Sequence, residues 1–139
     1  MQEPLKNSIM AMGMVANLMR KLLLVGDKPS KKNDDPSIAF VGTQSHKRIQ
    51  EWLDVILDED ADVIMVNRVD PGFAQHLIYA SLHQYRIIAL GEEAALALTD
   101  NGIVNYFKLP HPSGRNRKLN NKKYVEDVLQ KCKTWIEEN

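Results

Sequence analysis

The stretch KLLLVGDKPS, residues 21–30, decides the fold class of this sequence. Its apolar part is short and stops at Gly26, which is typical of a strand buried on both faces of a sheet. The polar segment that follows, residues 27–36, contains two prolines and predicts a loop. Similar short apolar runs recur as DVIMV (62–66), RIIAL (86–90) and VNYFKL (104–109). We therefore expect four strands.

The segments between these strands have helical periodicity. The first helix begins near Thr43 or Ser45, either of which suits an N-cap, and its apolar residues are Ile49, Trp52, Leu53 and Ile56. A second helix, at about 73–83, places on one face Phe73, Leu77, Ile78 and Leu82. A short third helix contains EEAALAL (92–98), with two glutamates where the helix dipole favours them. The last helix, at about 120–137, has a core stripe of Tyr124, Val125, Val128, Leu129, Cys132, Trp135 and Ile136.

Strands that alternate with helices predict a three-layer α/β/α fold with a four-stranded parallel sheet. Ligands of such sheets bind at the carboxyl ends of the strands. The unusual segments of this chain each follow a strand: GDKPS, NRVDP, LGEE and PHPSGRNR. We therefore expect these four segments to converge on one edge of the sheet.

Composition restricts the classes of function. The 139 residues suit one domain, and lysine plus arginine equal aspartate plus glutamate at 18 each, so a strongly basic nucleic-acid coat is excluded. We expect one domain over 19–139 and an N-terminal extension over 1–18, whose apolar stretch is too short to span a membrane. The single cysteine, Cys132, excludes an internal disulfide and suits a cytoplasmic protein.

Four residues next to predicted strands could carry chemistry. Asp27 could orient water or balance a developing cation, or it could cap its turn. Phe40, at the end of the first loop, could stack on a base or plug the core. Asn67 offers an acceptor and two donors to a base edge, or it could bond the next turn. His111 lies between two prolines that fix its direction, so it could donate to a developing anion or serve the turn alone.

The residues after His111 form a basic stretch at the entry to the last helix, which contains Arg115, Arg117, Lys118, Lys122 and Lys123. These side chains could contact phosphate, or they could be a solvated turn. The sequence shows no His, Cys, Asp or Glu cluster with metal spacing, no Walker loop and no GxGxxG motif. We therefore expect no metal and no cofactor.

These segments together resemble the uracil-DNA glycosylase superfamily, and the pattern is most similar to the family-4 type. The similar segments, in order, are Gly26–Ser30, Ala39–Gly42, Asn67–Val69, Ala89–Gly91 with Ala94–Ala95, and His111–Ser113. The resemblance implies that Asp27 handles water and the sugar cation, and that Phe40 stacks on a flipped base. It also implies that Asn67 recognises the base edge and that His111 stabilises the departing base. Phosphate contacts would come from Ser113, Arg115 and Arg117.

The chain also departs from the family-4 pattern. Family-4 enzymes carry four cysteines for an iron–sulfur cluster, whereas this chain has one. Asp27 stands where that family has a glutamate, and Ser30 replaces a glycine. The segment Gly114–Arg117 replaces the usual wedge that props open a duplex. Two functions therefore stay open. The first is hydrolysis of an N-glycosidic bond in uracil-containing or modified DNA, with single strands among the candidate substrates. The second is binding of a nucleotide without turnover.

Overall fold

The computed structural model describes residues 20–28, 44–58 and 60–138. The strands are β1 (Arg20–Gly26), β2 (Ala61–Asn67), β3 (Arg86–Leu90) and β4 (Tyr106–Leu109). The α-helices are α2 (Gln44–Ile56), α3 (Phe73–Leu82), α4 (Glu92–Asp100) and α5 (Lys122–Glu137), and a 3-10 helix, η1 (Arg117–Asn120), precedes α5. The strands pair in the order β2-β1-β3-β4, and every pairing is parallel. The predicted four-stranded parallel sheet is confirmed.

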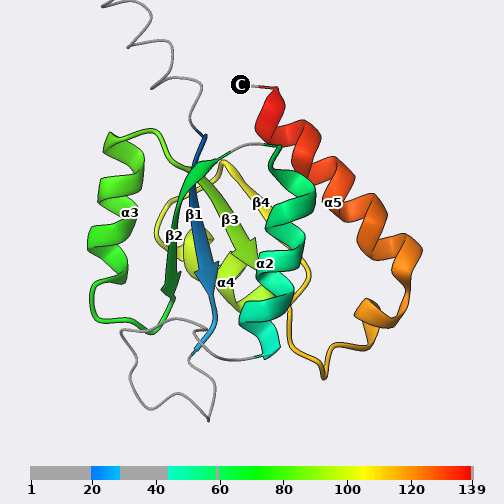
Figure 1. Ribbon diagram of the computed structural model, residues 1–139. Helices are drawn as coiled ribbons and strands as arrows, with labels where there is room; N and C mark the ends of the chain where they lie inside the picture. Colours follow the sequence, from blue (N-terminus) through cyan, green and yellow to red (C-terminus); the bar gives the residue numbers. More distant parts are fainter. Residues whose placement is uncertain (1–19, 29–43, 59, 139) are drawn as a thin grey trace, which may run out of the picture.

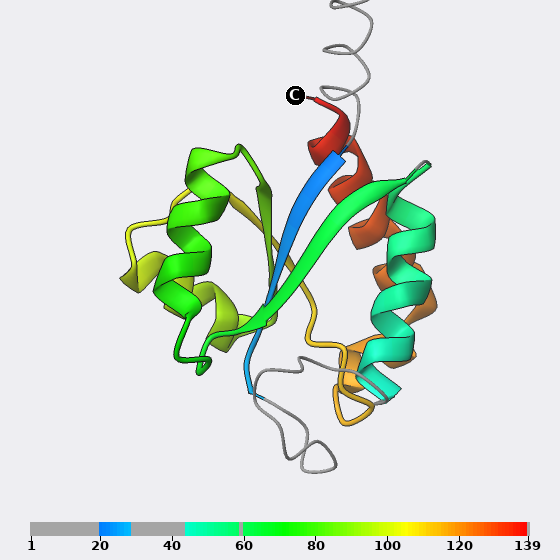
Figure 2. The ribbon, with the colours of Figure 1, turned by 60° about the vertical axis from the view of Figure 1, so that its left-hand side comes forward.

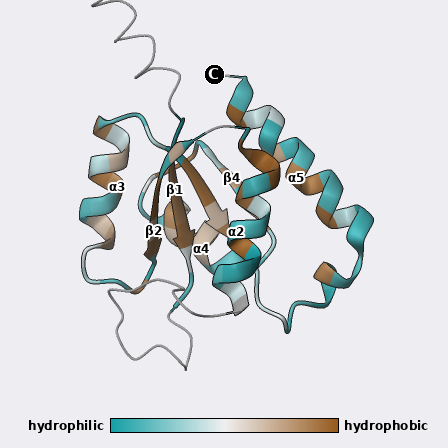
Figure 3. Ribbon diagram, viewed as in Figure 1, coloured by the Kyte–Doolittle hydropathy of each residue, from teal (hydrophilic) through white to brown (hydrophobic). Residues whose placement is uncertain are grey.

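The sheet is the middle of three layers. Helices α2 and α5 cover one face, and α3 and α4 cover the other (Figures 1 and 2). Alternate side chains of β1 serve the two faces: Leu22 and Leu24 pack in the core under α2 and α5, and Leu23 and Val25 pack in the core under α3 and α4. This alternation is what a strand buried on both faces requires. The strands are accordingly the most hydrophobic ribbons, while the helices also carry hydrophilic residues (Figure 3).

The helices match the expected order, with differences in which side chains they bury. The predicted stripe of α2 is buried as expected. In α3 the buried residues are Phe73, Leu77 and Ala80, whereas Ile78 and Leu82 are 60% and 74% exposed. The prediction of one apolar face containing Ile78 and Leu82 was therefore wrong. A short helix over the sheet buries only a narrow stripe, and Ala80 completes it.

Two predicted boundaries also shift. β4 begins at Tyr106 rather than Val104, and Val104 is almost fully exposed. The last helix begins at Lys122 because Asn121 accepts a hydrogen bond from the backbone N–H of Tyr124, as an N-cap does. Of its predicted stripe, Leu129, Cys132 and Ile136 are buried, and the others are partly buried. Phe40 and the expected N-terminal extension, 1–18, lie outside the described residues.

In the described part of the chain, no helix is both long and apolar enough to cross a membrane.

Candidate functional site

The described residues that follow the carboxyl ends of the parallel strands lie at one edge of the sheet. Gly26 and Asn67 are register partners at the ends of β1 and β2, so the next residues, Asp27 and Arg68, lie side by side. Arg68 Nε donates to Asp27 Oδ1 over 2.6 Å in a partly buried ion pair. The turn that Asp27 could cap continues into residues 29–43, which lie outside the described residues, so the capping role of Asp27 stays a prediction.

Asn67 is the one buried polar residue found among the described residues, and its side chain is 0% exposed. Its backbone carbonyl accepts the Asp70 N–H over 3.0 Å and so forms the turn after β2. Its Oδ1 and Nδ2 atoms, in contrast, have no hydrogen-bond partner among the residues that the structure describes. A buried amide without partners costs stability, so such groups call for an explanation. Within the described residues, the carboxamide makes no hydrogen bond to the turn that follows β2.

The loop after β4 holds His111 by contacts on several sides. The backbone N–H of Ser113 donates to His111 Nδ1 over 3.1 Å, and Asn116 Nδ2 donates to the His111 carbonyl over 2.9 Å. Because Nδ1 accepts, the neutral ring carries its proton on Nε2 and can donate from there. Gly91, with φ +97°, permits the close approach, since a Cβ there would lie 3.0 Å from His111 Cβ. The imidazole is therefore aimed by its surroundings.

Electrostatics link His111 to Asp27. Burial lowers the pKa of His111, and the negative charge of Asp27 opposes that shift by raising it. The pKa of the ring is lowered on balance, so neutral pH leaves the ring uncharged. The structure thus brings Asp27, Asn67 and His111 to the same edge. A carboxylate and an N–H donor there can serve opposite charges, a cation and an anion, that develop on one ligand.

Two arginines complete this edge and were not predicted. Arg68 engages Asp27, as described, and Arg48 Nη1 of α2 donates to the Pro112 carbonyl over 2.9 Å. The sequence places Asp27 and Arg68 directly after two strands, but their contact depends on the register of β1 against β2, which only the structure gives. Arg48 could not have been predicted, because nothing local indicates a contact with a loop 64 residues away.

The basic turn is exposed. Ser113 Oγ accepts the Arg115 N–H over 3.2 Å, which closes the turn, and the Arg115 and Arg117 side chains extend into solvent. Neither guanidinium has an acidic partner within the described ranges. The basic stretch lies before the last helix as expected, with Arg117 at the start of η1 and Asn121 as the N-cap of α5.

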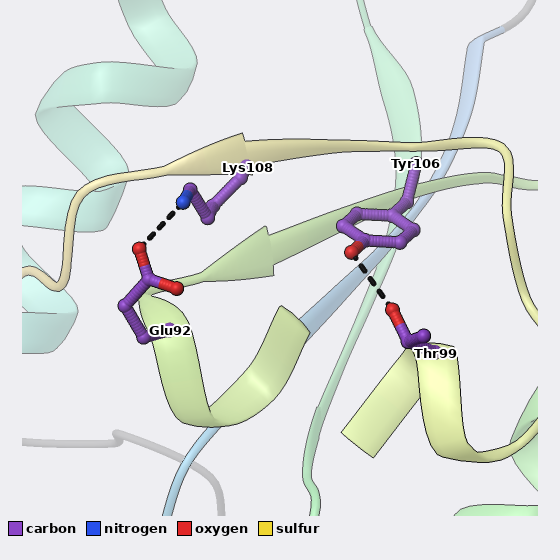
Figure 4. A network of polar contacts seen from close by, with 4 residues as sticks. All are labelled: Glu92, Thr99, Tyr106 and Lys108. Atoms are coloured by element: carbon purple, nitrogen blue, oxygen red, sulfur yellow. Dashed lines mark hydrogen bonds and ion pairs between the residues drawn. The ribbon is translucent and has the colours of Figure 1, made fainter. Parts of the chain in front are cut away.

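A pocket of about 370 Å³ adjoins His111 on the β4 side. Gly91, His111, Asn116, Lys118 and Tyr124 are among its lining residues. Glu92 and Lys108 also line it and form an ion pair of 2.5 Å (Figure 4). The hydrogen bond with Lys108 lowers the pKa of Glu92, and the charge of Lys108 adds to that effect.

No group of three His, Cys, Asp or Glu side chains that could hold a metal ion occurs in the residues that the structure describes. Cys132 is buried in the core, and burial raises the pKa of its thiol to about 12.

Comparison with known proteins agrees with this arrangement. No protein with a curated description matches the chain significantly. The sequence does match the uracil DNA glycosylase superfamily over residues 14–133, which is most of its length. Because the match spans the whole sheet and the loops at its carboxyl edge, the chain belongs to the uracil DNA glycosylase superfamily.

Proposed function

We propose that this chain hydrolyses the N-glycosidic bond of uracil or a related modified base in DNA, on double or single strands. The observation that carries the proposal is the Asn67 carboxamide, which is fully buried and has no hydrogen-bond partner in the described part of the chain. One acceptor and two donors in a fixed position match the edge of a nucleobase. A base turned out of its stack would restore the hydrogen bonds that the fold leaves unmade.

The reaction develops two opposite charges, and Asp27 and His111 can each stabilise one of them. Breaking the bond between C1′ and the base nitrogen leaves a sugar cation and a base anion. The Asp27 carboxylate stabilises the cation and orients the water that adds to C1′, and the His111 Nε2–H donates to the base oxygen that becomes negative. The position of the Nε2 proton follows from the Ser113 bond to Nδ1. The resemblance adds Phe40 as the residue that stacks on the base.

The basic turn supplies the phosphate contacts in this proposal. Arg115 and Arg117 are exposed next to the loop that aims His111, and guanidinium groups suit phosphate oxygens. Ser113 Oγ already accepts the Arg115 N–H and retains its own proton for a phosphate oxygen. The three residues would hold the strand that carries the target base.

The family-4 type is the subtype proposed here, without its cluster. A cluster with four cysteine ligands does not fit a chain whose one cysteine is buried in the core. No step of the reaction therefore involves iron. We also propose a single domain over 19–139 that acts in the cytoplasm, as the cysteine content suggests.

One observation favours a second function, nucleotide binding without turnover. Asp27 is engaged by Arg68 at 2.6 Å, and side-chain exposures of 18% for Asp27 and 33% for Arg68 leave the pair partly shielded from water. A carboxylate held in this way is less available to water and to a sugar cation. A protein that only sequesters a nucleotide would need the base-binding and phosphate-binding groups but not a free Asp27.

The deciding experiment presents the purified protein with uracil-containing single-stranded and double-stranded oligonucleotides, followed by alkaline cleavage at abasic sites. We expect strand breaks at uracil with the wild type and none with Asp27→Asn. If the wild type produces no breaks in any substrate while a free nucleotide still binds, hydrolysis is wrong and sequestration takes its place. Asp27→Asn should then leave the affinity for that nucleotide nearly unchanged.

A further inference from the structure

The pocket beside His111 has features that base release does not use. It is about 370 Å³ in volume, within the range of small-molecule sites. Its lining includes the start of α4, through Glu92 and Glu93, and the segment after His111, through Asn116 and Lys118. Tyr124, from the first turn of α5, contributes an aromatic ring. Aromatic rings of this kind stack on bases of any sequence.

Some of the charged side chains that line the pocket are neutralised by an ion pair, and others are not. Lys108 and Glu92 neutralise each other through their ion pair (Figure 4). Glu93 and Lys118, in the described part of the chain, have no ion-pair partner. The charge of Lys118 also acts on Glu92, so it lies close to the start of α4. The pocket therefore offers one free cation and one free carboxylate beside an aromatic ring.

We infer that this pocket binds a guanine nucleotide. A carboxylate only accepts hydrogen bonds, and it accepts two parallel N–H groups well. Guanine presents two adjacent donors on one edge, N1–H and the 2-amino group, whereas the other common bases place an acceptor beside each donor. Glu93 accepts from this edge, Lys118 pairs with the phosphate and Tyr124 stacks on the ring.

Hydrogen bonds of Asn116 connect the pocket to His111. Asn116 lines it, donates to the His111 carbonyl over 2.9 Å and accepts the Lys118 N–H over 3.2 Å. His111 and Gly91 line it directly. A nucleotide there lies next to any base held against His111. Its source is therefore either the neighbour of the target base in one strand, which depends on the proposed function, or a free guanine nucleotide.

The test is a site-resolved titration of the full chain, labelled with 15N, with deoxyguanosine and deoxyinosine monophosphates. Deoxyinosine lacks only the 2-amino group. We expect the guanine nucleotide to shift the amide signals of Glu93, Lys118 and Tyr124 and to bind at least about tenfold more tightly, because it makes one more hydrogen bond to a charged acceptor. Equal binding of the two nucleotides, or shifts that disappear in Asn67→Ala, would overturn the inference.

Substitutions of Glu93 and Lys118 test which group of the nucleotide each side chain contacts. Glu93→Gln should remove the preference for guanine over hypoxanthine, and the control Glu137→Gln, at the far end of α5, should retain it. Lys118→Ala should weaken binding of the monophosphate and leave binding of deoxyguanosine unchanged. If Glu93→Gln retains the full preference, Glu93 does not accept from the base and the inference fails.

Oligonucleotides separate the two sources of the nucleotide. The target uracil is flanked by guanine or by hypoxanthine, and base release is measured with the wild type and Glu93→Gln. A guanine preference that Glu93→Gln removes identifies the neighbour in the strand, and no preference together with monophosphate binding identifies a free nucleotide. A wild type that releases no base but binds deoxyguanosine monophosphate at Glu93 contradicts the proposed function and supports this pocket.

Discussion

The backbone N–H of Ser113 donates to Nδ1 of His111 over 3.1 Å, and this bond fixes which ring nitrogen carries the proton. A protonated imidazole would place a second N–H at Nδ1, against the Ser113 donor. Burial disfavours the charged ring as well and lowers the pKa of His111. The loop and the burial therefore favour the same neutral form, with Nε2–H as the donor.

The first prediction concerns pH. An unfolded histidine titrates at about 6.5, and folded His111 titrates lower, so the unfolded chain binds more protons as the pH falls below that value. The free energy of unfolding contributed by His111 is thus fully present above about pH 6.5 and declines as the pH falls towards the folded pKa. NMR titration should show a pKa for His111 below that of an unfolded histidine, about 6.5.

Asp27→Asn provides the check on this first prediction. The Asp27 charge raises the pKa of His111, so its removal should lower that pKa further. His111→Gln should remove the corresponding part of the pH dependence of unfolding. A His111 pKa above about 6.5, or one that rises in Asp27→Asn, would contradict the assignment.

The second prediction compares two glycines. Gly91 and Gly102 have φ values of +97° and +81°, so alanine at either is strained, at about 1–3 kcal/mol. A Cβ at Gly91 would also lie 3.0 Å from His111 Cβ, whereas nothing lies within 4 Å of one at Gly102. Gly91→Ala should therefore displace His111 and reduce base release or ligand binding. Gly102→Ala, the matched control, should lose stability alone, as thermal unfolding and activity together would show.

Much of the fold followed from the sequence because its strands have clear limits. β3 matches RIIAL because the run begins at Arg86 and stops before Gly91. β4 was predicted too long because Val104 is apolar yet lies exposed before the strand. The amino-acid type alone cannot distinguish an exposed apolar residue from a buried one. The stripe of α3 failed for the same reason, since Ile78 is apolar but faces solvent.

The sequence predicted those site residues whose place in the fold follows from lying directly after a strand. Asp27, Asn67 and His111 each follow a strand, and parallel strands bring such residues to one edge. The ion pair of Asp27 with Arg68 depends on register, which the sequence leaves open. The unpaired carboxamide of Asn67 depends on every neighbour of that side chain, so only coordinates could reveal it.

The third prediction is that Asn67 costs stability. Asn67→Leu keeps the number and branching of the side-chain heavy atoms and removes two buried polar atoms that have no partner among the described residues, so we expect the protein to become more stable by about 1–3 kcal/mol. The variant should lose base binding. Asn116→Leu is the contrast, because Asn116 bonds the His111 carbonyl and the Lys118 N–H, and it should be destabilising. Urea unfolding of both variants measures the difference, and a less stable Asn67→Leu would show that the carboxamide has a structural partner.

The fourth prediction concerns the ion pair of Asp27 with Arg68. If Asp27 acts on charge that develops during the reaction, Asp27→Asn should lower kcat far more than it weakens binding of uracil-containing DNA. Arg68→Ala releases the carboxylate, and a double-mutant cycle on unfolding should give a coupling of about 0.5–3 kcal/mol for groups in contact. Equal losses of kcat and affinity in Asp27→Asn would instead assign Asp27 to ground-state binding.

The fifth prediction uses salt to identify what Arg115 contacts. The side chain is exposed, and no acidic residue of the described chain pairs with it. If it neutralises a phosphate of a DNA strand, Arg115→Ala should lower the slope of log affinity against log salt by about one. With a free nucleotide the slope should be shallow for the wild type, yet the variant should still bind more weakly.

The control for this prediction is Lys131→Ala, which removes an exposed cation on α5 and should change neither the salt slope nor the affinity. Because counterion release depends on the number of phosphates contacted, the two ligands give different slopes even where Arg115 contributes equally to both affinities. Unchanged affinity for both ligands in Arg115→Ala would make the basic turn a solvated surface.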